Sequence, residues 1–118
     1  MERLRHRADY LAAAGGTKVP AGAFVLQARR RDDEGPARVG FTVSRRVGNA
    51  VERNRVRRRL KEMVRFLPVG PMRAGFDYVL VGRRAALALP FSRLYSDLTS
   101  ALARVHGGQR SLNDERSR

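Results

Sequence analysis

Apolar and polar residues alternate in two segments of the first half of the chain, which is the period of half-buried β-strands. Successive side chains of a strand point to opposite faces, so a strand over 22–29 separates two sets of residues: Phe24, Leu26 and Ala28 from Val25, Gln27 and Arg29. A strand over 37–44 likewise separates Val39, Phe41 and Val43 from Gly40, Thr42 and Ser44. The polar run 30–36 between them predicts a hairpin connection, and 17–20 predicts a further edge strand.

Three other segments repeat their apolar residues with the period of an α-helix. Residues 4–14 predict a short helix that ends at Gly15 and Gly16. A helix over 51–67, stopped by Pro68, has a continuous apolar stripe made of Val56, Leu60, Met63, Val64 and Leu67. The last predicted helix, 90–106, has its own stripe, made of Leu94, Leu98, Ala101, Leu102 and Val105.

The near-continuous apolar run 76–82 is typical of a strand in the centre of a sheet. Because a helix separates it from the strand 37–44, the connection is a crossover, and we expect these two strands to be parallel. The pattern therefore predicts an α/β (α+β) two-layer sandwich with a roughly four-stranded sheet and three helices, in the order α-β-β-β-α-β-α, with one sheet face less covered. The length is that of one domain, which we expect over 1–106, followed by a disordered polar tail over 107–118.

The amino-acid composition indicates an anionic partner. The 118 residues include 25 Lys and Arg against 11 Asp and Glu, a formal net charge of +14, which favours binding to nucleic acid or to an anionic membrane surface. The chain has no cysteine, which excludes disulfides and thiolate metal sites. Its charged N-terminus differs from a secretory signal, and no apolar run approaches the roughly 20 residues that span a bilayer, so we expect a cytoplasmic protein.

The densest charge lies between Arg45 and Arg65, where nine cations face only Glu52 and Glu62. Solvated helix faces usually balance their charges with acid–base pairs, and this segment cannot. A basic helix on a membrane needs a free apolar face, but here the core needs that face. A helix-turn-helix for DNA needs two helices in tandem, whereas strands flank this helix. Nucleic acid is therefore favoured over a membrane.

The same segment carries a motif. The run Val39–Glu62 reads VGFTVSRRVGNAVERNRVRRRLKE, with Arg53, Asn54 and Arg55 at its centre. It resembles the bacterial ribonuclease P protein subunit, a family whose RNR motif is named after that triplet. The resemblance extends over about residues 3–106, in the family's order, and includes the segments 3–10, 24–26 and 77–81 and the closing helix.

This resemblance implies an accessory subunit of a ribonucleoprotein endoribonuclease. In that family the catalyst is an RNA that uses magnesium ions, and the complex removes the 5′ leader of precursor tRNA. The protein helps to hold the leader and the active form of the catalytic RNA. The expected partners are thus ribonuclease P RNA and the precursor tRNA 5′ leader, with no membrane or DNA as a partner and no cofactor bound by the protein itself. The implied fold is a compact α/β sandwich with a left-handed crossover, whereas the general rule favours the right-handed one.

Two groups of candidate RNA-binding residues follow. The loop and polar face of the basic helix suit the catalytic RNA, because guanidinium groups bridge phosphates and an amide reads a sugar or a base edge; these residues are Arg45, Arg46, Asn49, Arg53, Asn54, Arg55, Arg57, Arg58, Lys61 and Arg65. The start of that helix adds free N–H groups near Arg53. The less covered sheet face suits a single-stranded leader, and its candidates are Tyr10, Val25, Gln27, Arg29, Thr42 and Ser44.

The leader candidates depart from the family's pattern. Tyr10 also has a second interpretation, as a core residue beneath the sheet. The family commonly has a second aromatic residue one helical turn later, where this chain has Ala14, and often an aromatic residue where Gln27 stands. These departures predict contacts with the leader that are thinner or displaced.

No set of residues predicts catalysis by the protein itself. A ribonuclease needs positioned acid and base groups or metal-binding carboxylates, but His6 and His106 are isolated, the acidic run 32–34 is typical of a turn, and Asp77 has no carboxylate neighbour in the sequence. We therefore expect no catalytic and no metal-binding residue. A ribosomal or ribosome-assembly protein is the alternative that composition leaves open, and only the run 39–62 argues against it.

Overall fold

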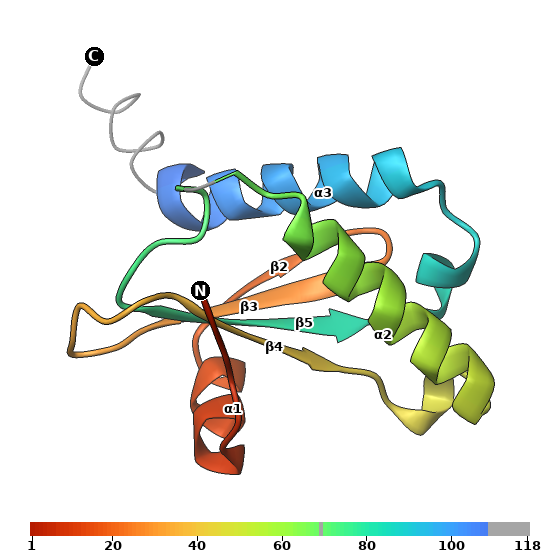
Figure 1. The fold of residues 1–118 in the computed structure, drawn as a ribbon, viewed down its shortest axis with the longest axis horizontal. Coiled ribbons are helices and arrows are strands. Elements are labelled where there is room, and N and C mark those ends of the chain that lie inside the picture. Colours follow the sequence, from red (N-terminus) through yellow and green to blue (C-terminus); the bar gives the residue numbers. More distant parts are fainter. Residues whose placement is uncertain (69, 109–118) are drawn as a thin grey trace.

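A five-stranded sheet with helices on both faces forms the protein (Figure 1). The computed structural model describes residues 1–68 and 70–108. The strands are β1 (Glu2–Arg3), β2 (Thr17–Pro20), β3 (Phe24–Arg30), β4 (Arg38–Thr42) and β5 (Phe76–Gly82). The helices are α1 (Arg7–Ala14), α2 (Ala50–Arg65) and α3 (Phe91–Ala103), and the short helical turns are η1 (Arg45–Val47), η2 (Arg84–Leu87) and η3 (Arg104–Gly108).

β5 lies at the centre of the sheet, whose strand order is β1-β4-β5-β3-β2. β4 and β5 are parallel, as predicted from the crossover, and β3 pairs with the other edge of β5 in antiparallel orientation. The predicted hairpin over 30–36 is therefore wrong, because β5 lies between the two strands that it would join. A strand as apolar as β5 needs hydrogen-bond partners on both edges, and local sequence does not reveal which strands supply them. The predicted edge strand 17–20 is confirmed as β2.

The first residues of the chain differ from the prediction. The helix predicted from residue 4 begins at Arg7. The residues before it run along β4, and the N–H groups of Glu2 and Leu4 donate to backbone carbonyl oxygens there at 2.8 and 2.9 Å. This pairing adds a fifth strand where about four were predicted, and it satisfies backbone groups on the outer edge of β4.

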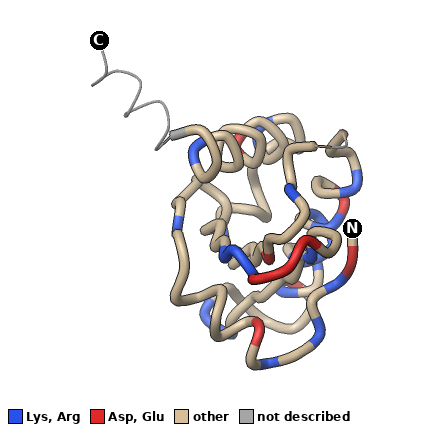
Figure 2. Tube along the Cα trace, turned by 90° about the vertical axis from the view of Figure 1, so that its left-hand side faces the viewer, with Lys and Arg blue, Asp and Glu red and all other residues tan. Residues whose placement is uncertain are grey.

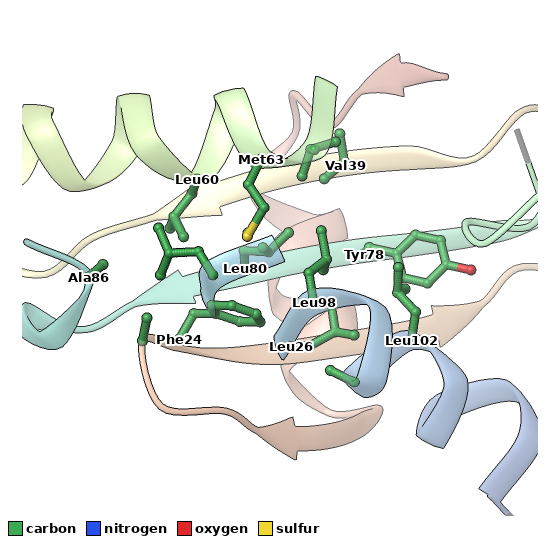
Figure 3. Close-up of a cluster of buried hydrophobic side chains, with 14 of the residues drawn as sticks. Phe24, Leu26, Val39, Leu60, Met63, Tyr78, Leu80, Ala86, Leu98 and Leu102 are labelled. Atoms are coloured by element: carbon green, nitrogen blue, oxygen red, sulfur yellow. The ribbon is translucent and has the colours of Figure 1, made fainter. Parts of the chain in front are cut away.

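The main core lies between the sheet and the helices α2 and α3 (Figure 3). Leu60 and Met63 of α2 and Leu98 of α3 point toward the sheet, where Phe24 and Leu80 meet them. All five side chains are fully buried, so the apolar stripes predicted for both helices are confirmed as core. Burial of this stripe fixes which side of α2 faces solvent.

The opposite sheet face is covered less. In the described part of the chain α1 is the only helix on this side (Figure 1), over a small cluster of Leu4, Ala13 and Val79. The prediction of one less covered face is therefore confirmed. We name this side the open sheet face; its strand residues are Val25, Gln27, Arg29, Arg38, Gly40, Thr42, Asp77, Val79 and Val81.

The ends of the last two long helices come slightly earlier than predicted. α2 ends at Arg65 and α3 at Ala103, where the π-helical turn η3 follows. Two residues of the predicted disordered tail, Gly107 and Gly108, belong to that turn, and 109–118 lie outside the described residues. No helix in the described ranges is long and apolar enough to cross a bilayer.

Candidate nucleic-acid interface

The basic helix α2 begins with a capping box. Asn49 Oδ1 accepts a hydrogen bond from the Glu52 N–H at 2.8 Å, and Glu52 Oε1 accepts one from the Asn49 N–H at 3.0 Å. Arg84 Nη2 donates to the other oxygen of Glu52 at 3.0 Å. These hydrogen bonds, from Arg84 first and then from the Asn49 backbone, hold the pKa of Glu52 below its ordinary value. The capping box thus uses the N–H groups of Asn49 and Glu52 and places a carboxylate at the start of α2.

Two predicted RNA-binding arginines of α2 are oriented by bonds within the protein. Arg53 Nη1 donates to the Gly48 carbonyl oxygen at 2.7 Å. Arg57 Nη1 donates to Asn54 Oδ1 at 2.9 Å. Each guanidinium has five N–H donors, so one such bond holds the side chain in place and leaves most of its donors for a partner.

Arg55, Arg58 and Lys61 form a cationic patch on α2, which we name the α2 patch. Arg55 and Arg58 are exposed, and among the described residues none of the three takes part in an ion pair. Burial, followed by the charges of Arg3 and Arg57, lowers the pKa of Lys61. A hollow on this side of the helix is lined by Val51, Asn54, Arg57, Arg58 and Lys61. An anionic partner would relieve the repulsion among these cations.

Two further cations of α2 have contrasting surroundings. Arg59, which the sequence interpretation leaves outside the site, donates to the carbonyl oxygens of Ala86 and Leu89 at 2.6 and 2.7 Å and so ties α2 to η2. Arg65 pairs with Glu62 at 3.0 Å, but both side chains are open to solvent, where such a pair contributes little. Arg65 is thus accessible to RNA, whereas Arg59 serves the fold.

The turn η1 between β4 and α2 presents Arg45 and Arg46 to solvent. Arg84 Nη1 donates to the Val47 carbonyl oxygen at 2.6 Å, which brings the end of β5 against this turn. The sequence interpretation missed Arg83 and Arg84, although two consecutive arginines directly after the central strand are a visible signal. Arg45, Arg46, Arg83 and Arg84 are all exposed. They lie at the C-terminal ends of β4 and β5.

The predicted leader residues gather on the open sheet face and at its border: Tyr10, Val25, Gln27, Arg29, Thr42 and Ser44. The ring of Tyr10 lies directly on Gly40, where an added Cβ would meet the Tyr10 hydroxyl oxygen at 2.5 Å. That hydroxyl donates to the Leu4 carbonyl oxygen at 3.2 Å. The ring therefore packs on the sheet but is only half-buried, and its contact with the leader stays a prediction.

A buried carboxylate lies where the open sheet face reaches the N-terminal ends of β4 and β5. Asp77 is fully buried, and Arg31 and Arg38 donate to it at 2.7 Å. Burial alone raises the pKa of Asp77, but the hydrogen bonds from Arg38 and Arg31 outweigh it and hold the pKa below its ordinary value. Figure 2 views this end of the molecule, where blue Lys and Arg positions lie beside the red acidic run of the β3–β4 loop. Asp77 anchors the strands, since both of its oxygens are engaged.

Comparison with known proteins identifies the family. A family model described as ribonuclease P matches residues 1–106. The chain belongs to the ribonuclease P protein family. The ribonuclease P protein component of Gluconacetobacter diazotrophicus is 48% identical over 104 residues, which cover 87% of this chain and 90% of the relative. That of Ruegeria pomeroyi is 47% identical over 106 residues, 87% and 85% of the two chains.

Solved structures agree with the fold of this ribonuclease P family protein. An RNase P protein from Thermotoga maritima superposes with a TM-score of 0.75 at 29% identity, over 91% of this chain and all of that one. The resemblance carried by the run 39–62 and the predicted mixed α/β sandwich are confirmed, and the ribosomal alternative is not supported. Within the family fold, the α2 patch and the open sheet face are two separate surfaces, joined by the arginines of the turn η1.

Proposed function

We propose that this protein is the protein component of ribonuclease P and binds both the catalytic RNA and the 5′ leader of precursor tRNA, thereby assisting the endonucleolytic 5′ maturation of tRNA. Its relatives carry that component's name and are parts of an endoribonuclease complex. The observation that carries the proposal is the α2 patch. Its three cations lie on a helix whose other side is locked into the core, so the charge is presented by a rigid scaffold to a structured anion.

The catalytic RNA is assigned to the outer side of α2 and to the loop before it. This surface combines guanidinium groups that can bridge phosphates with an amide that can reach a sugar hydroxyl or a base edge. The residues assigned to it are Arg45, Arg46, Asn49, Arg53, Asn54, Arg55, Arg57, Arg58, Lys61 and Arg65. We add Arg83 and Arg84, because both are exposed and Arg84 is bonded to the turn η1.

The leader is assigned to the open sheet face. The Tyr10 ring covers Gly40 in its middle, and half-buried side chains such as Val25, Gln27 and Thr42 lie around it. A single strand can lie on such a surface and stack a base on an aromatic ring without a matching sequence. A structured RNA helix is too wide to use it in the same way.

The hydrolytic step is assigned to the partner RNA and its magnesium ions, and the protein is assigned no cofactor of its own. Asp77 is tied up by two arginines. His106 Nε2 lies 2.6 Å from the Tyr78 hydroxyl, which also accepts a hydrogen bond from the Arg73 N–H at 2.8 Å. These groups serve packing and loop structure, so the role of the protein is binding.

Reconstitution tests this division of labour. Purified protein, freed of copurifying RNA, should leave precursor tRNA intact with any divalent ion. Addition of ribonuclease P RNA and magnesium should produce cleavage at the 5′ end of the mature tRNA. Cleavage by protein that carries no RNA would contradict the accessory role, and copurification of ribosomal RNA from cells would contradict the choice of partner.

Substitution of the α2 patch tests the catalytic RNA surface. Arg55→Ala plus Arg58→Ala should weaken holoenzyme assembly with or without a leader. Loss of two phosphate contacts should also flatten the log–log salt dependence of assembly by roughly 1.4–1.8, at about 0.7–0.9 per contact. Arg30→Ala plus Arg104→Ala removes the same charge from exposed positions elsewhere and should leave assembly unchanged. Equal effects of the two pairs would show that net charge, and not this surface, drives assembly.

Tyr10→Ala tests the leader surface. If the exposed part of the ring stacks on a leader base, precursor tRNA should bind about 1–3 kcal/mol more weakly to the reconstituted enzyme. Mature tRNA, which lacks the leader, should bind as before, and the salt dependence should not change because no charge is removed. Equal weakening of both RNAs, or loss of the fold, would assign Tyr10 to the core alone.

A further inference from the structure

Three aromatic side chains meet where α2 ends and α3 begins, outside the residues assigned so far. Phe66 directly follows α2, and its ring lies edge-on to that of Phe91, the first residue of α3, with the centroids 5.7 Å apart and the planes at 78°. The Tyr95 hydroxyl donates to the Phe66 carbonyl oxygen at 3.3 Å. The chain has five Phe, three Tyr and no Trp, so three of its eight aromatic residues gather here. We name Phe66, Phe91 and Tyr95 the aromatic junction.

Phe66 is exposed although its backbone is held on both sides. It is one of four large apolar residues that remain exposed among the described residues, at 59%. Its N–H donates to the Met63 carbonyl oxygen at 3.3 Å, and Tyr95 binds its carbonyl oxygen. Met63 of α2 and Leu94 of α3 are fully buried beside the junction. Isolated exposed apolar residues are common, but a ring on a fixed backbone that continues into two more aromatic side chains offers a preformed surface for stacking.

The aromatic junction continues into a cationic hollow on α2. Phe66 lies one helical turn beyond Glu62, and Glu62 lies two turns beyond Arg55, so all three are on one side of the helix. A hollow of about 330 Å³ on this side is lined by Arg55, Arg58, Arg59, Glu62 and Phe91. One part of its wall is thus aromatic, and three of the other lining residues are arginines. This surface combines a ring that can stack with guanidinium groups that can bind phosphate.

Two kinds of ligand can cover an exposed aromatic surface: an apolar patch of another protein, or an unpaired nucleobase. The core of a protein–protein interface is depleted of charged residues, whereas here the exposed Arg55 and Arg58 border the hollow that Phe91 lines. Proteins recognise RNA loops and bulges by stacking splayed bases on aromatic side chains while cationic groups bind the backbone. The charge beside the aromatic junction therefore favours the nucleobase.

We infer that the aromatic junction and this hollow bind an unpaired nucleotide of the catalytic RNA, with its base stacked on the Phe66 ring and the adjoining phosphates bound by Arg55 and Arg58. The inference rests on the proposed function and deepens it, because it adds a site for an unstacked base to the phosphate contacts of α2. Phe91 and Tyr95 are positioning residues for Phe66. The leader is not the ligand, since the sheet separates α2 and α3 from the open sheet face (Figure 1).

Binding of the full-length protein to ribonuclease P RNA, without tRNA, tests the inference. Phe66→Ala should weaken this assembly roughly 5- to 150-fold, the loss expected for one base stacked on an aromatic ring. The log–log salt dependence should stay as in the wild type because no charge is removed, whereas Arg55→Ala plus Arg58→Ala should flatten it. Phe66→Tyr keeps the aromatic face and should bind as the wild type does. Phe66→Leu keeps an apolar side chain without that face and should bind as weakly as Phe66→Ala.

A matched variant and a probe of the RNA control for exposure and for folding. Leu11 of α1 is 59% exposed, as Phe66 is, so Leu11→Ala removes an equally exposed apolar side chain and should leave assembly unchanged. Urea denaturation reports whether Phe66→Ala keeps its fold, and Phe66→Leu serves as the test if it does not. Chemical probing of the bound RNA should find an unpaired nucleotide that the wild type and Phe66→Tyr protect. That nucleotide should become reactive with Phe66→Leu, while the other protections remain.

The outcomes separate this inference from the proposed function. If Phe66→Ala and Phe66→Leu assemble as Leu11→Ala does, the stacking site is overturned, and a loss in the arginine pair would still support the α2 surface. Wild-type affinity of Phe66→Leu would show apolar packing in place of stacking and also overturn the inference, as would self-association of the free protein that Phe66→Ala abolishes without a change in RNA affinity. If neither Phe66 nor the arginine pair affects assembly, the catalytic RNA lies elsewhere and the proposed α2 surface fails as well.

Discussion

Arginine crowds two regions of this protein, and the two regions use it in opposite ways. In the α2 patch, Arg55 and Arg58 are exposed and form no ion pair within the described residues, although Glu62 lines a hollow with them. At the N-terminal ends of β4 and β5, Arg31 and Arg38 surround the fully buried Asp77 and bind it at 2.7 Å. In the first region the arginines are exposed to solvent, whereas in the second region they are neutralised by a buried carboxylate.

The difference shows that arginine density alone does not mark a binding surface. A buried carboxylate is tolerable only when it is paired and hydrogen-bonded, so Arg31 and Arg38 are required by Asp77. Exposed cations on α2 repel each other instead and oppose folding slightly until an anion arrives. Mutations in the two regions should therefore affect stability and binding in opposite proportions.

The largest effect is expected from Asp77→Asn. This change leaves Arg31 and Arg38 without their carboxylate, and removal of one partner of a buried ion pair costs about 3–5 kcal/mol. Arg55→Ala plus Arg58→Ala should cost almost nothing in stability, because no buried partner is stranded. Urea denaturation of the three proteins measures the free energies of unfolding. Similar losses in both variants would remove the distinction between the two regions.

The dependence of stability on acidic pH should also distinguish Asp77 from the α2 patch. The pKa of Asp77 is lower in the folded state than its ordinary value of 3.8, so its contribution to stability is complete above that value and disappears as the pH falls through the folded pKa. Asp33 and Glu52 also have lowered pKa values, so part of the acid sensitivity is independent of Asp77. The free energy of unfolding should fall less between about pH 4 and 2 in Asp77→Asn than in the wild type, and parallel curves would contradict this role.

The smallest of these effects is expected from anions. Sulfate that binds the folded α2 patch should stabilise the protein by mass action, by about 2.7 kcal/mol at a concentration 100 times its Kd. Thermal melts in sulfate should therefore exceed those in chloride at matched ionic strength. Arg55→Ala plus Arg58→Ala should reduce this gain, whereas Asp77→Asn should lower the baseline and keep the gain. Identical curves in both salts would argue against a preformed anion site on α2.

The open sheet face, which we propose as the surface for the leader, was harder to predict than the basic helix. Alternation along β3 and β4 placed Val25, Gln27 and Thr42 on one face, and the structure puts them there. The sequence left Tyr10 with two interpretations, because a single aromatic residue in a short helix has no period to orient it. Only the structure shows that the ring packs on Gly40 and is half-buried.

Most of the helices and strands could be predicted from hydrophobic periodicity and charge. The strand 76–82, the two amphipathic helices and the parallel pairing of β4 with β5 were predicted because these signals are local or follow from the length of a connection. The order of the strands was not, since a two-residue strand at the N-terminus has no pattern and the separation of β3 from β4 depends on the later strand β5. The left hand of the crossover, implied by the family resemblance, stays a prediction.

What the sequence determined by itself is that this is a strongly cationic α/β domain with one basic helix, since net charge and hydrophobic periodicity are properties of the sequence alone. Which arginines are accessible was decided only by the tertiary structure. Arg58 and Arg59 are neighbours in the chain, yet Arg59 is bound by the carbonyl oxygens of Ala86 and Leu89, 27 and 30 residues away. Arg31 meets Asp77 across 46 residues. The partners of Arg59 and Arg31 come from distant parts of the sequence, so they can be identified only in the folded structure.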